Sequence, residues 1–419
     1  MNRKNLRILW FLIPAALAAV CALLLFPGPR PVSEDLQAAA VQKLQPENAT
    51  SPRQEKSPVR QVVMNDYLSP YYRSPDDLAP FAVAALYEDG TVKVACHADD
   101  RALYASAAFW KNIQKIWMRN TTLFGLDADG RLHTTGSYDI QNLTGVTDLL
   151  FLDGAIYAVQ KDGTTVPVSG TEGTTPSVIP GKTVIKALPF SDIYDWGSLI
   201  LYRDGTIAST DTFGYMGQLE GLGNVRDIFV FGQTPAAVLK DGTLMLPEGP
   251  VPDLTGAVKL VSAYSGMLFA VTGEGKVKYS SKVNPMIADA LASMPGTGAL
   301  DIPDMEGMRA SHAVILYEDG TVFSPTPKLN EVVKGWRDIV QLNWYEDYDY
   351  MVLYGLRRDG TVIAATMGFD CDWAEVTGNY RGWKLQSLHV IPFSGAIGIT
   401  VDGNVVGDYA FEYVDLSEL

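Results

Sequence analysis

The sequence predicts an all-β chain folded as a single β-propeller. Nine of its Asp-Gly or Glu-Gly pairs recur at regular intervals, and a short apolar run precedes most of these nine. The pairs are spaced about 39 residues apart, and no stretch beyond the N-terminus keeps an apolar period of 3.6 residues. Repeats of about 40 residues with three or four short strands each are typical of propeller blades.

The repeated pairs define the turns of the predicted blades. Asp-Gly between two apolar runs predicts a hairpin with a type I′ turn, which needs a positive φ at both central residues. Six of the nine pairs are followed by Thr, a good strand former where the chain re-enters the sheet. The glycines of the nine pairs are Gly90, Gly130, Gly163, Gly205, Gly242, Gly275, Gly320, Gly360 and Gly403.

The clearest unit runs from 336 to 368. Its apolar alternation predicts a leading strand over 336–342, and a loop over 343–350 follows it. A second strand at 351–356 leads into the turn at Asp359, and a third follows at 362–365. A weaker first unit begins near 62–64. Because one blade cannot bury both of its faces alone, we expect about seven to nine blades to close into a ring.

The repeats resemble the regulator of chromosome condensation repeat family, in a bacterial envelope form. The residues that carry the resemblance are Trp336-Arg337-Asp338-Ile339-Val340, and His312 to Leu316 followed by Asp319-Gly320-Thr321-Val322. The resemblance covers about residues 60–419 and implies a propeller, most often seven-bladed, that recognises protein partners through loops on one face. It also implies that His312 is a structural hydrogen-bond partner between sheets.

The N-terminus predicts a membrane anchor. Residues 8–26 are uncharged and apolar, which is long enough for a helix to cross the ~30 Å hydrocarbon core. Basic residues before this run predict a cytoplasmic tail at 1–7 and a propeller outside the cell at 61–419. Residues 27–60 read as a disordered linker. The alternative is a cleaved signal peptide, although the run is long and no small-residue cleavage site follows it.

Charge restricts the class of partner. From residue 61 onward the chain has 25 Lys and Arg against 44 Asp and Glu, a net charge of −19. Nucleic-acid binding needs a basic footprint, so it is not expected. Basic protein patches, cationic peptides, neutral glycans and divalent cations remain compatible.

Few residues of the sequence indicate a catalytic or metal-binding role. No sequence motif of a hydrolase nucleophile, a zinc protease or a phosphate loop is present, so we expect no enzyme activity and no cofactor. Asp127 and Asp129 only resemble the start of a calcium loop and lack its later ligands, so no metal site is predicted. Cys96 and Cys371 read as two separate core thiols, with a disulfide between them as the alternative.

The candidate binding residues lie in loops between the first and second strand of each unit, which must emerge on one face of a ring. Aromatic residues beside acids on such loops are typical of recognition surfaces. The predicted site comprises Trp117, Asp192, Tyr194, Asp195, Trp196, Trp344, Tyr345, Glu346, Asp347, Tyr348, Asp349 and Tyr350.

These features predict a membrane-anchored, non-catalytic module that binds a protein or peptide. One alternative is a carbohydrate-binding module of the cell envelope, with Trp196, Trp344 and Tyr348 as stacking platforms. The other is an envelope hydrolase on a propeller frame, which needs converging carboxylates with a raised pKa on one of them.

Overall fold

The computed structural model describes fourteen stretches of the chain. They are residues 57–64, 82–152, 155–168, 182–191, 196–209, 216–231, 234–263, 267–280, 287–303, 312–346, 351–368, 372–391, 395–408 and 414–419. Cys371 and the predicted tail at 1–7 lie outside them, as does most of the predicted linker.

These residues form nine small antiparallel sheets, each built from strands consecutive in the chain, here called blades 1 to 9 in chain order. The first strands are β1 (Val59–Met64), β4 (Ile113–Arg119), β7 (Val146–Leu152), β10 (Val184–Ser191), β13 (Val225–Phe231), β17 (Ala257–Ala263), β20 (Ala299–Asp301), β23 (Ile339–Glu346) and β27 (Leu385–Ile391). The second strands are β2 (Ala82–Tyr87), β5 (Thr122–Asp127), β8 (Ala155–Gln160), β11 (Trp196–Tyr202), β14 (Thr234–Leu239), β18 (Met267–Thr272), β21 (Ile315–Tyr317), β24 (Met351–Arg357) and β28 (Gly395–Thr400).

The third strands complete most blades. They are β3 (Val92–Cys96), β6 (Leu132–Thr134), β9 (Thr165–Val168), β12 (Ile207–Ser209), β15 (Leu244–Leu246), β19 (Val277–Tyr279), β22 (Val322–Phe323), β25 (Val362–Met367) and β29 (Val405–Gly407). Blades 5 and 8 add β16 (Gly249–Pro250) and β26 (Trp373–Val376). Short helices connect some blades: α3 (Arg101–Tyr104), α4 (Ala288–Ser293), α5 (Pro327–Val333), and the 3-10 turns η2 (Ala98–Asp100), η3 (Ala105–Phe109), η4 (Gly217–Leu219), η5 (Pro252–Leu254) and η7 (Tyr380–Gly382). The 3-10 turn η9 (Leu416–Glu418) follows blade 9.

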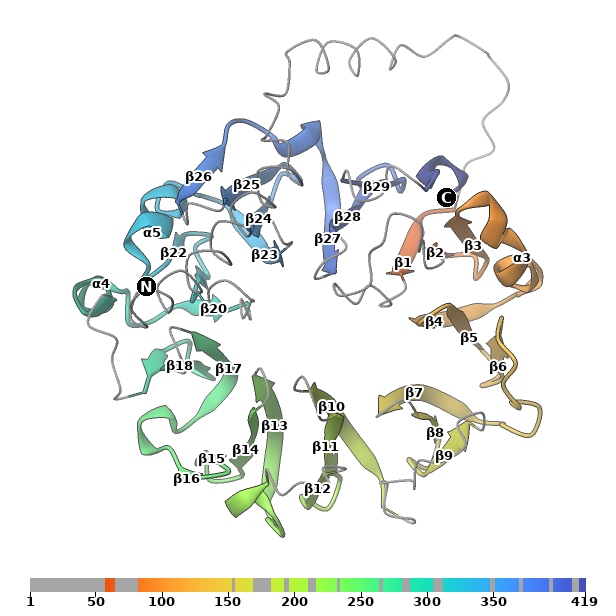
Figure 1. Cartoon of the computed structure of the whole chain (residues 1–419), viewed down its shortest axis with the longest axis horizontal. Coiled ribbons are helices and arrows are strands. Elements are labelled where there is room, and N and C mark those ends of the chain that lie inside the picture. The colour runs from red at the N-terminus through yellow and green to blue at the C-terminus, as the bar shows by residue number, and fades with distance from the viewer. Residues whose placement is uncertain are drawn as a thin grey trace, which may run out of the picture. The chain divides into compact units, whose positions relative to one another are not determined.

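The nine blades close into a ring, with their first strands toward the centre (Figure 1). Each blade packs on the next through a cluster of buried side chains. The last cluster joins Val59 and Val83 of blade 1 to Ile397 and Val405 of blade 9. A closed ring of radially arranged antiparallel sheets is a β-propeller. The predicted all-β propeller is therefore confirmed, with nine blades in the described chain.

The turns differ from the predicted type. Their glycines have φ between 70° and 91°, but none of the Asp or Glu residues before them has a positive φ. In blade 1, Gly90 N–H donates to the Tyr87 carbonyl (3.0 Å) and Tyr87 N–H to the Thr91 carbonyl (2.9 Å). This pattern is a type I turn closed by a left-handed glycine bulge, so the type I′ prediction was wrong. The Thr also does more than favour a strand, because Thr91 Oγ1 donates to Asp89 Oδ1 (2.6 Å).

Six of the nine turns, those of blades 1, 2, 4, 5, 7 and 8, are hydrogen-bonded to two blades at once. In blade 8, the Gly360 carbonyl accepts from Leu385 N–H of blade 9 (2.7 Å), and Arg358 N–H donates to the Asp338 carbonyl of its own blade (2.8 Å). A Cβ on Gly360 would lie 2.7 Å from the Leu385 carbonyl oxygen. Glycine is therefore required twice here, for its positive φ and for the close approach of the neighbouring blade.

The leading strand of blade 8 begins later and ends later than predicted. Asp338 has a φ of 59°, which interrupts the extended backbone and delays the strand to Ile339. Asn343, Trp344 and Tyr345 then pair with Tyr354, Leu353 and Val352 instead of forming a loop. The loop predicted over 343–350 was therefore wrong at its first four residues.

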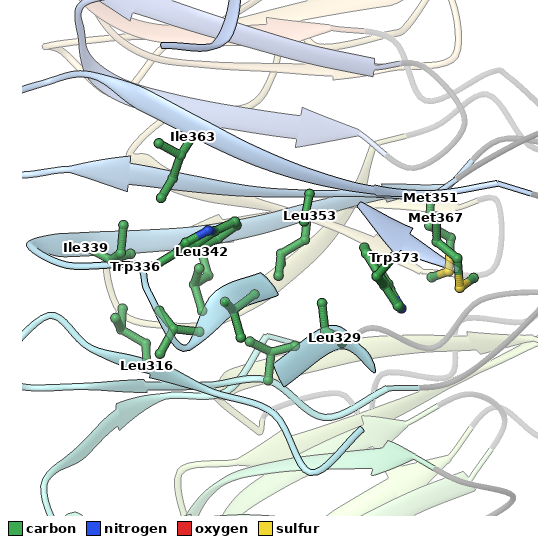
Figure 2. Close-up of a cluster of buried hydrophobic side chains, with 14 residues drawn as sticks. Leu316, Leu329, Trp336, Ile339, Leu342, Met351, Leu353, Ile363, Met367 and Trp373 are labelled. Atoms are coloured by element: carbon green, nitrogen blue, oxygen red, sulfur yellow. The ribbon is translucent and has the colours of Figure 1, made fainter. Parts of the chain in front are cut away.

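Trp336 and Trp373 belong to the cluster between blades 7 and 8, to which α5 contributes Leu329 (Figure 2). Trp336 is 1 % exposed, and its ring lies where Gly355 has no side chain. A Cβ built on Gly355 would be 3.0 Å from the Trp336 ring. The Trp110 ring fills the equivalent space at Gly125 of blade 2, where a built Cβ would be 2.8 Å from the ring. The repeated Trp thus fills a notch left by a strand glycine.

The predicted localisation as a single-pass membrane protein was wrong. Among the helices that the structure describes, none has the length and apolar character needed to cross a membrane. The longest of them, α5, has 7 residues, whereas a span needs about 20. The predicted anchor at 8–26 lies outside the described residues.

Candidate functional site

Seven of the predicted site residues lie outside the described part of the chain. They are Asp192, Tyr194, Asp195, Asp347, Tyr348, Asp349 and Tyr350. The strands on either side of these segments are the first and second strands of blades 4 and 8. Both segments therefore connect equivalent strands, as the repeat pattern predicted.

The remaining predicted residues lie on strands. Tyr345 is 2 % exposed and packs with Tyr354 and Trp383 between blades 8 and 9, so it belongs to the core. Trp344 is half-buried against the cluster of blades 7 and 8. Glu346 ends β23 and pairs with Met351, while Trp196 begins β11 and pairs with Ser191. The structure separates Trp344 from Tyr345, because neighbours on a strand point to opposite faces.

Trp117, in β4, is also half-buried and takes part in a polar contact between blades. Lys115 Nζ lies over its ring, 4.8 Å from the ring centroid. The same Nζ lies 2.8 Å from Asp148 Oδ1 of blade 3. The Trp therefore orients a cation that joins two blades.

Lys115 and Asp148 belong to a belt of side chains that recurs once per blade on the first strands. Each member is the residue that pairs directly after a skip in the strand register. The belt comprises Gln61, Lys115, Asp148, Lys186, Asp227, Lys259, Asp301, Gln341 and Ser387.

Lysine and aspartate alternate in the belt from blade 2 to blade 7. Lys186 Nζ reaches Asp227 Oδ1 of the next blade at 2.7 Å, and Lys259 pairs with Asp301. Where the belt is neutral, an amide replaces the ion pair: Gln341 Nε2 donates to the Leu388 carbonyl (2.7 Å). The alternation pairs a donor on one blade with an acceptor on the next, so most of this charge is already satisfied within the ring.

The register skip leaves one extra residue on each first strand, a β-bulge just before the belt. Polar side chains occupy five of these positions: Arg60, Gln114, Thr147, Arg226 and Gln386. Aliphatic side chains occupy the other four, and all of them are exposed: Ile185 (53 %), Val258 (43 %), Leu300 (52 %) and Val340 (42 %).

Three of the aliphatic residues stand on the consecutive blades 6, 7 and 8. We call Val258, Leu300 and Val340 the apolar arc, and Gln114, Thr147 and Gln386 the polar arc. Single exposed aliphatic residues are common on protein surfaces. Here the same bulge position exposes an aliphatic side chain on three blades in succession, and clustered exposed apolar side chains are typical of interaction sites. Sequence reasoning missed it, although Val258, Leu300 and Val340 each occupy the second position of a leading strand.

The turns beside the bulges are acidic and ionised. Hydrogen bonds from the Thr321 hydroxyl and N–H hold the pKa of Asp319 below its usual value. The equivalent bonds from Thr206, together with Lys182, hold the pKa of Asp204 at about 2. The turn carboxylates thus stay charged at neutral pH and suit electrostatic recognition rather than proton donation.

The described residues offer little for catalysis or metal binding. Every carboxyl group there whose pKa clearly departs from its usual value has it lowered, whereas a glycosidase acid needs a raised one. Within the same residues, no three of His, Cys, Asp or Glu come together as metal ligands. Asp127 instead accepts from Asp129 N–H (3.0 Å) and from His133 Nε2 (3.0 Å).

His312 and Cys96 are core residues. Burial lowers the pKa of His312 to about 4, and its Nδ1 lies 3.1 Å from Thr326 Oγ1. Its ring meets Trp373 of blade 8 edge-on at 5.6 Å. Cys96 is a buried free thiol beside a cavity of about 320 Å³ next to Tyr104. Arg101 and Glu418 form an ion pair at that cavity.

Comparison with known proteins gives only weak likenesses. No family model matches the chain, and no curated protein matches it. The computationally designed Ika8 protein matches with a TM-score of 0.37 at 15 % identity, over 70 % of this chain and 95 % of that chain. The receptor kinase CR4 ectodomain of Physcomitrella patens gives 0.35 at 11 % identity, over 75 % and 74 %. Prp20p of Saccharomyces cerevisiae gives 0.22 at 10 % identity, over 80 % and 72 %. The fold assignment therefore depends on the blade topology itself.

Proposed function

We propose that this chain is a non-catalytic propeller of the regulator of chromosome condensation type that binds a protein or peptide partner. One observation carries the proposal: three successive blades expose an aliphatic side chain at the same bulge position. Burying such side chains against a partner contributes free energy in proportion to the apolar area removed from water. Most turns of the ring that presents them are hydrogen-bonded to two blades, which holds neighbouring blades together.

A second surface for the same function is the face of the loops between first and second strands. Its support is the sequence, where Trp196, Tyr194, Tyr348 and Tyr350 stand among acids. Tyr345 is excluded from this surface because it is buried. A glycan platform has less support here, since a sugar needs a flat exposed ring and Trp344 is packed against the core.

The experiment compares three forms of the whole chain as bait for partners from its native cells. One form is unchanged, one carries Val258→Ser, Leu300→Ser and Val340→Ser, and one carries Tyr194→Ser, Tyr348→Ser and Tyr350→Ser. We expect a partner that the unchanged chain captures and that the first variant loses by at least about tenfold, since each buried aliphatic chain is worth about 1.5–3 kcal/mol. Loss only with the second variant would assign binding to the loop face. Equal capture by all three forms would contradict both surfaces.

A further inference from the structure

The apolar arc is bordered by acidic turns. The turn of each blade lies against the first strand of the next, so Leu300 is flanked by the turn with Glu274 and Val340 by the turn with Glu318 and Asp319. The hydrogen bonds that fix this arrangement run from Ala299 N–H to the Gly275 carbonyl (2.9 Å) and from Ile339 N–H to the Gly320 carbonyl (3.1 Å). Apolar and acidic groups therefore share one end of these blades.

The polar side chains that follow the arc on the same strands already have partners. Lys259 pairs with Asp301 of the next blade, and Gln341 donates to the Leu388 carbonyl. Glu274 pairs with Lys276 (2.6 Å), so what the surface offers to another molecule is mainly its aliphatic side chains and the turn carboxylates beside Val340. Glu318 is exposed and forms no salt bridge with any described residue.

The charge of the whole chain has the same sign as these turns. From residue 61 onward the net charge is −19. Such a charge repels acidic ligands and steers cationic ones toward the surface. A partner that buried only apolar groups would leave Glu318 and Asp319 without compensation at its edge, whereas a partner with basic residues beside its apolar ones would satisfy both.

We propose that the apolar arc and its acidic turns bind a basic amphipathic peptide segment, in which aliphatic side chains alternate with Lys or Arg. This inference depends on the proposed function and specifies the chemistry of the partner. The aliphatic side chains of the segment cover Val258, Leu300 and Val340, and its cations lie beside Glu318 and Asp319. The polar arc, on blades 2, 3 and 9, takes no part.

The test uses three dye-labelled ten-residue peptides, each titrated with the whole chain and followed by fluorescence polarisation. The first alternates Leu with Lys, the second alternates Ser with Lys, and the third alternates Leu with Glu. We expect the Leu-Lys peptide to bind at least about tenfold more tightly than either comparator, because it alone supplies apolar burial and charge complementarity together. Added salt should weaken its binding.

Matched variants assign the binding to the arc. The triple variant Val258→Ser, Leu300→Ser and Val340→Ser should lose at least about tenfold in affinity for the Leu-Lys peptide. The triple variant Gln114→Ser, Thr147→Ser and Gln386→Ser alters the same bulge position on other blades and should bind as the unchanged chain does. Glu318→Gln should weaken binding by about two- to fivefold and reduce its salt dependence. Circular dichroism of each variant confirms that the ring is intact.

Two results would overturn the inference. One is equal binding of the Leu-Glu peptide, and the other is unchanged binding by the apolar-arc variant. If the Leu-Lys peptide fails to bind while that variant still loses the cellular partner, the partner chemistry is wrong and the proposed function stands. If the variant also keeps the cellular partner, the function proposed for this surface is wrong as well.

Discussion

The junction between blades 7 and 8 and the junction between blades 8 and 9 both have a Trp ahead of the first strand, yet they are packed differently. Trp336 precedes β23 by three residues and fills the notch at Gly355. Trp383 precedes β27 by only two, and Leu385 occupies the equivalent notch at Gly398 instead. One residue of spacing thus decides which side chain enters the notch.

The displaced Trp383 takes part in a different arrangement. Its ring packs edge-to-face on Tyr380 (5.4 Å), and Tyr380 packs in the same way on Tyr354 (5.3 Å). The Tyr354 hydroxyl donates to Asp408 Oδ2 (3.1 Å), which also accepts from Ala396 N–H (3.1 Å). The first junction is therefore packed around one large ring, whereas the second is built around a buried carboxylate inside an aromatic cluster.

The largest effect should come from removing the ring at the first junction. Trp336→Ala leaves a cavity among fully buried side chains, and we expect it to lower the free energy of unfolding by about 3–5 kcal/mol. Trp383→Ala is the matched variant. Because the Trp383 ring is more exposed than that of Trp336, its removal should lower the free energy of unfolding by less. Urea titration followed by circular dichroism measures both. Equal losses would show that the notch adds nothing to the stability of the ring.

The first junction should also lose stability in acid through His312. Its pKa is about 4 in the folded chain, below the ordinary value of 6.5, because burial disfavours the cation. The unfolded chain therefore binds more protons between these values, so the stabilising contribution is complete above pH 6.5 and declines as pH falls toward 4. The decline should reach about 3 kcal/mol.

Comparing the unchanged chain with His312→Gln isolates this titration. Urea titrations from pH 7.5 to 4 measure the free energy of unfolding of both forms, and the other histidines provide the same background in each. The stability of the variant should depend less steeply on pH over this window. Parallel curves would mean that His312 does not titrate differently in the folded and unfolded chains.

The second junction should respond to the loss of one hydroxyl group. Tyr354→Phe keeps the ring and removes a donor from Asp408, which is 2 % exposed. A buried acceptor that loses a partner costs about 1–3 kcal/mol. Tyr380→Phe is the comparison, since it keeps the aromatic contacts and the bond to Asp408 and removes only the hydrogen bond between the Tyr380 and Tyr354 hydroxyls. Thermal unfolding measures Tm, which should fall clearly more in Tyr354→Phe than in Tyr380→Phe.

The smallest effect should come from the belt at the same junction. Gln341→Leu removes the bond from Nε2 to the Leu388 carbonyl, and a neutral hydrogen bond contributes about 0.5–1.5 kcal/mol net. Lys186→Met breaks the Lys186–Asp227 pair between blades 4 and 5, where solvent screens the charges. It should lower the free energy of unfolding by no more than Gln341→Leu does. A loss as large as that of Trp336→Ala would identify the belt as a principal stabiliser.

The sequence predicted the fold well because its signals are local. The turn glycines and the apolar runs beside them are set by nearby backbone geometry, so each blade could be recognised separately. The notch was missed because Trp336 and Gly355 lie nineteen positions apart in the printed sequence and on different strands. Only the strand pairing brings them together, and a local period does not report it.

The candidate site was predicted less well, for a related reason. Tyr345 looked like a loop aromatic, but the pairing of β23 with β24 extends past it and turns it inward. The apolar arc went unnoticed because Val258 and Val340 look like ordinary strand residues. Their exposure follows from a register skip that depends on the partner strand.

Closure of the ring has a consequence for how the chain folds. The last turn reaches the first blade where Gly403 approaches Pro58, across nearly the whole folded sequence. Intermediate blades can assemble from neighbours as the polypeptide emerges from the ribosome, but this final seam must wait until blade 9 has been synthesised. Joining such distant segments is entropically slow. Sealing the circle should therefore be the late step of maturation, and the interval before it is when unsealed edges are most vulnerable to aggregation.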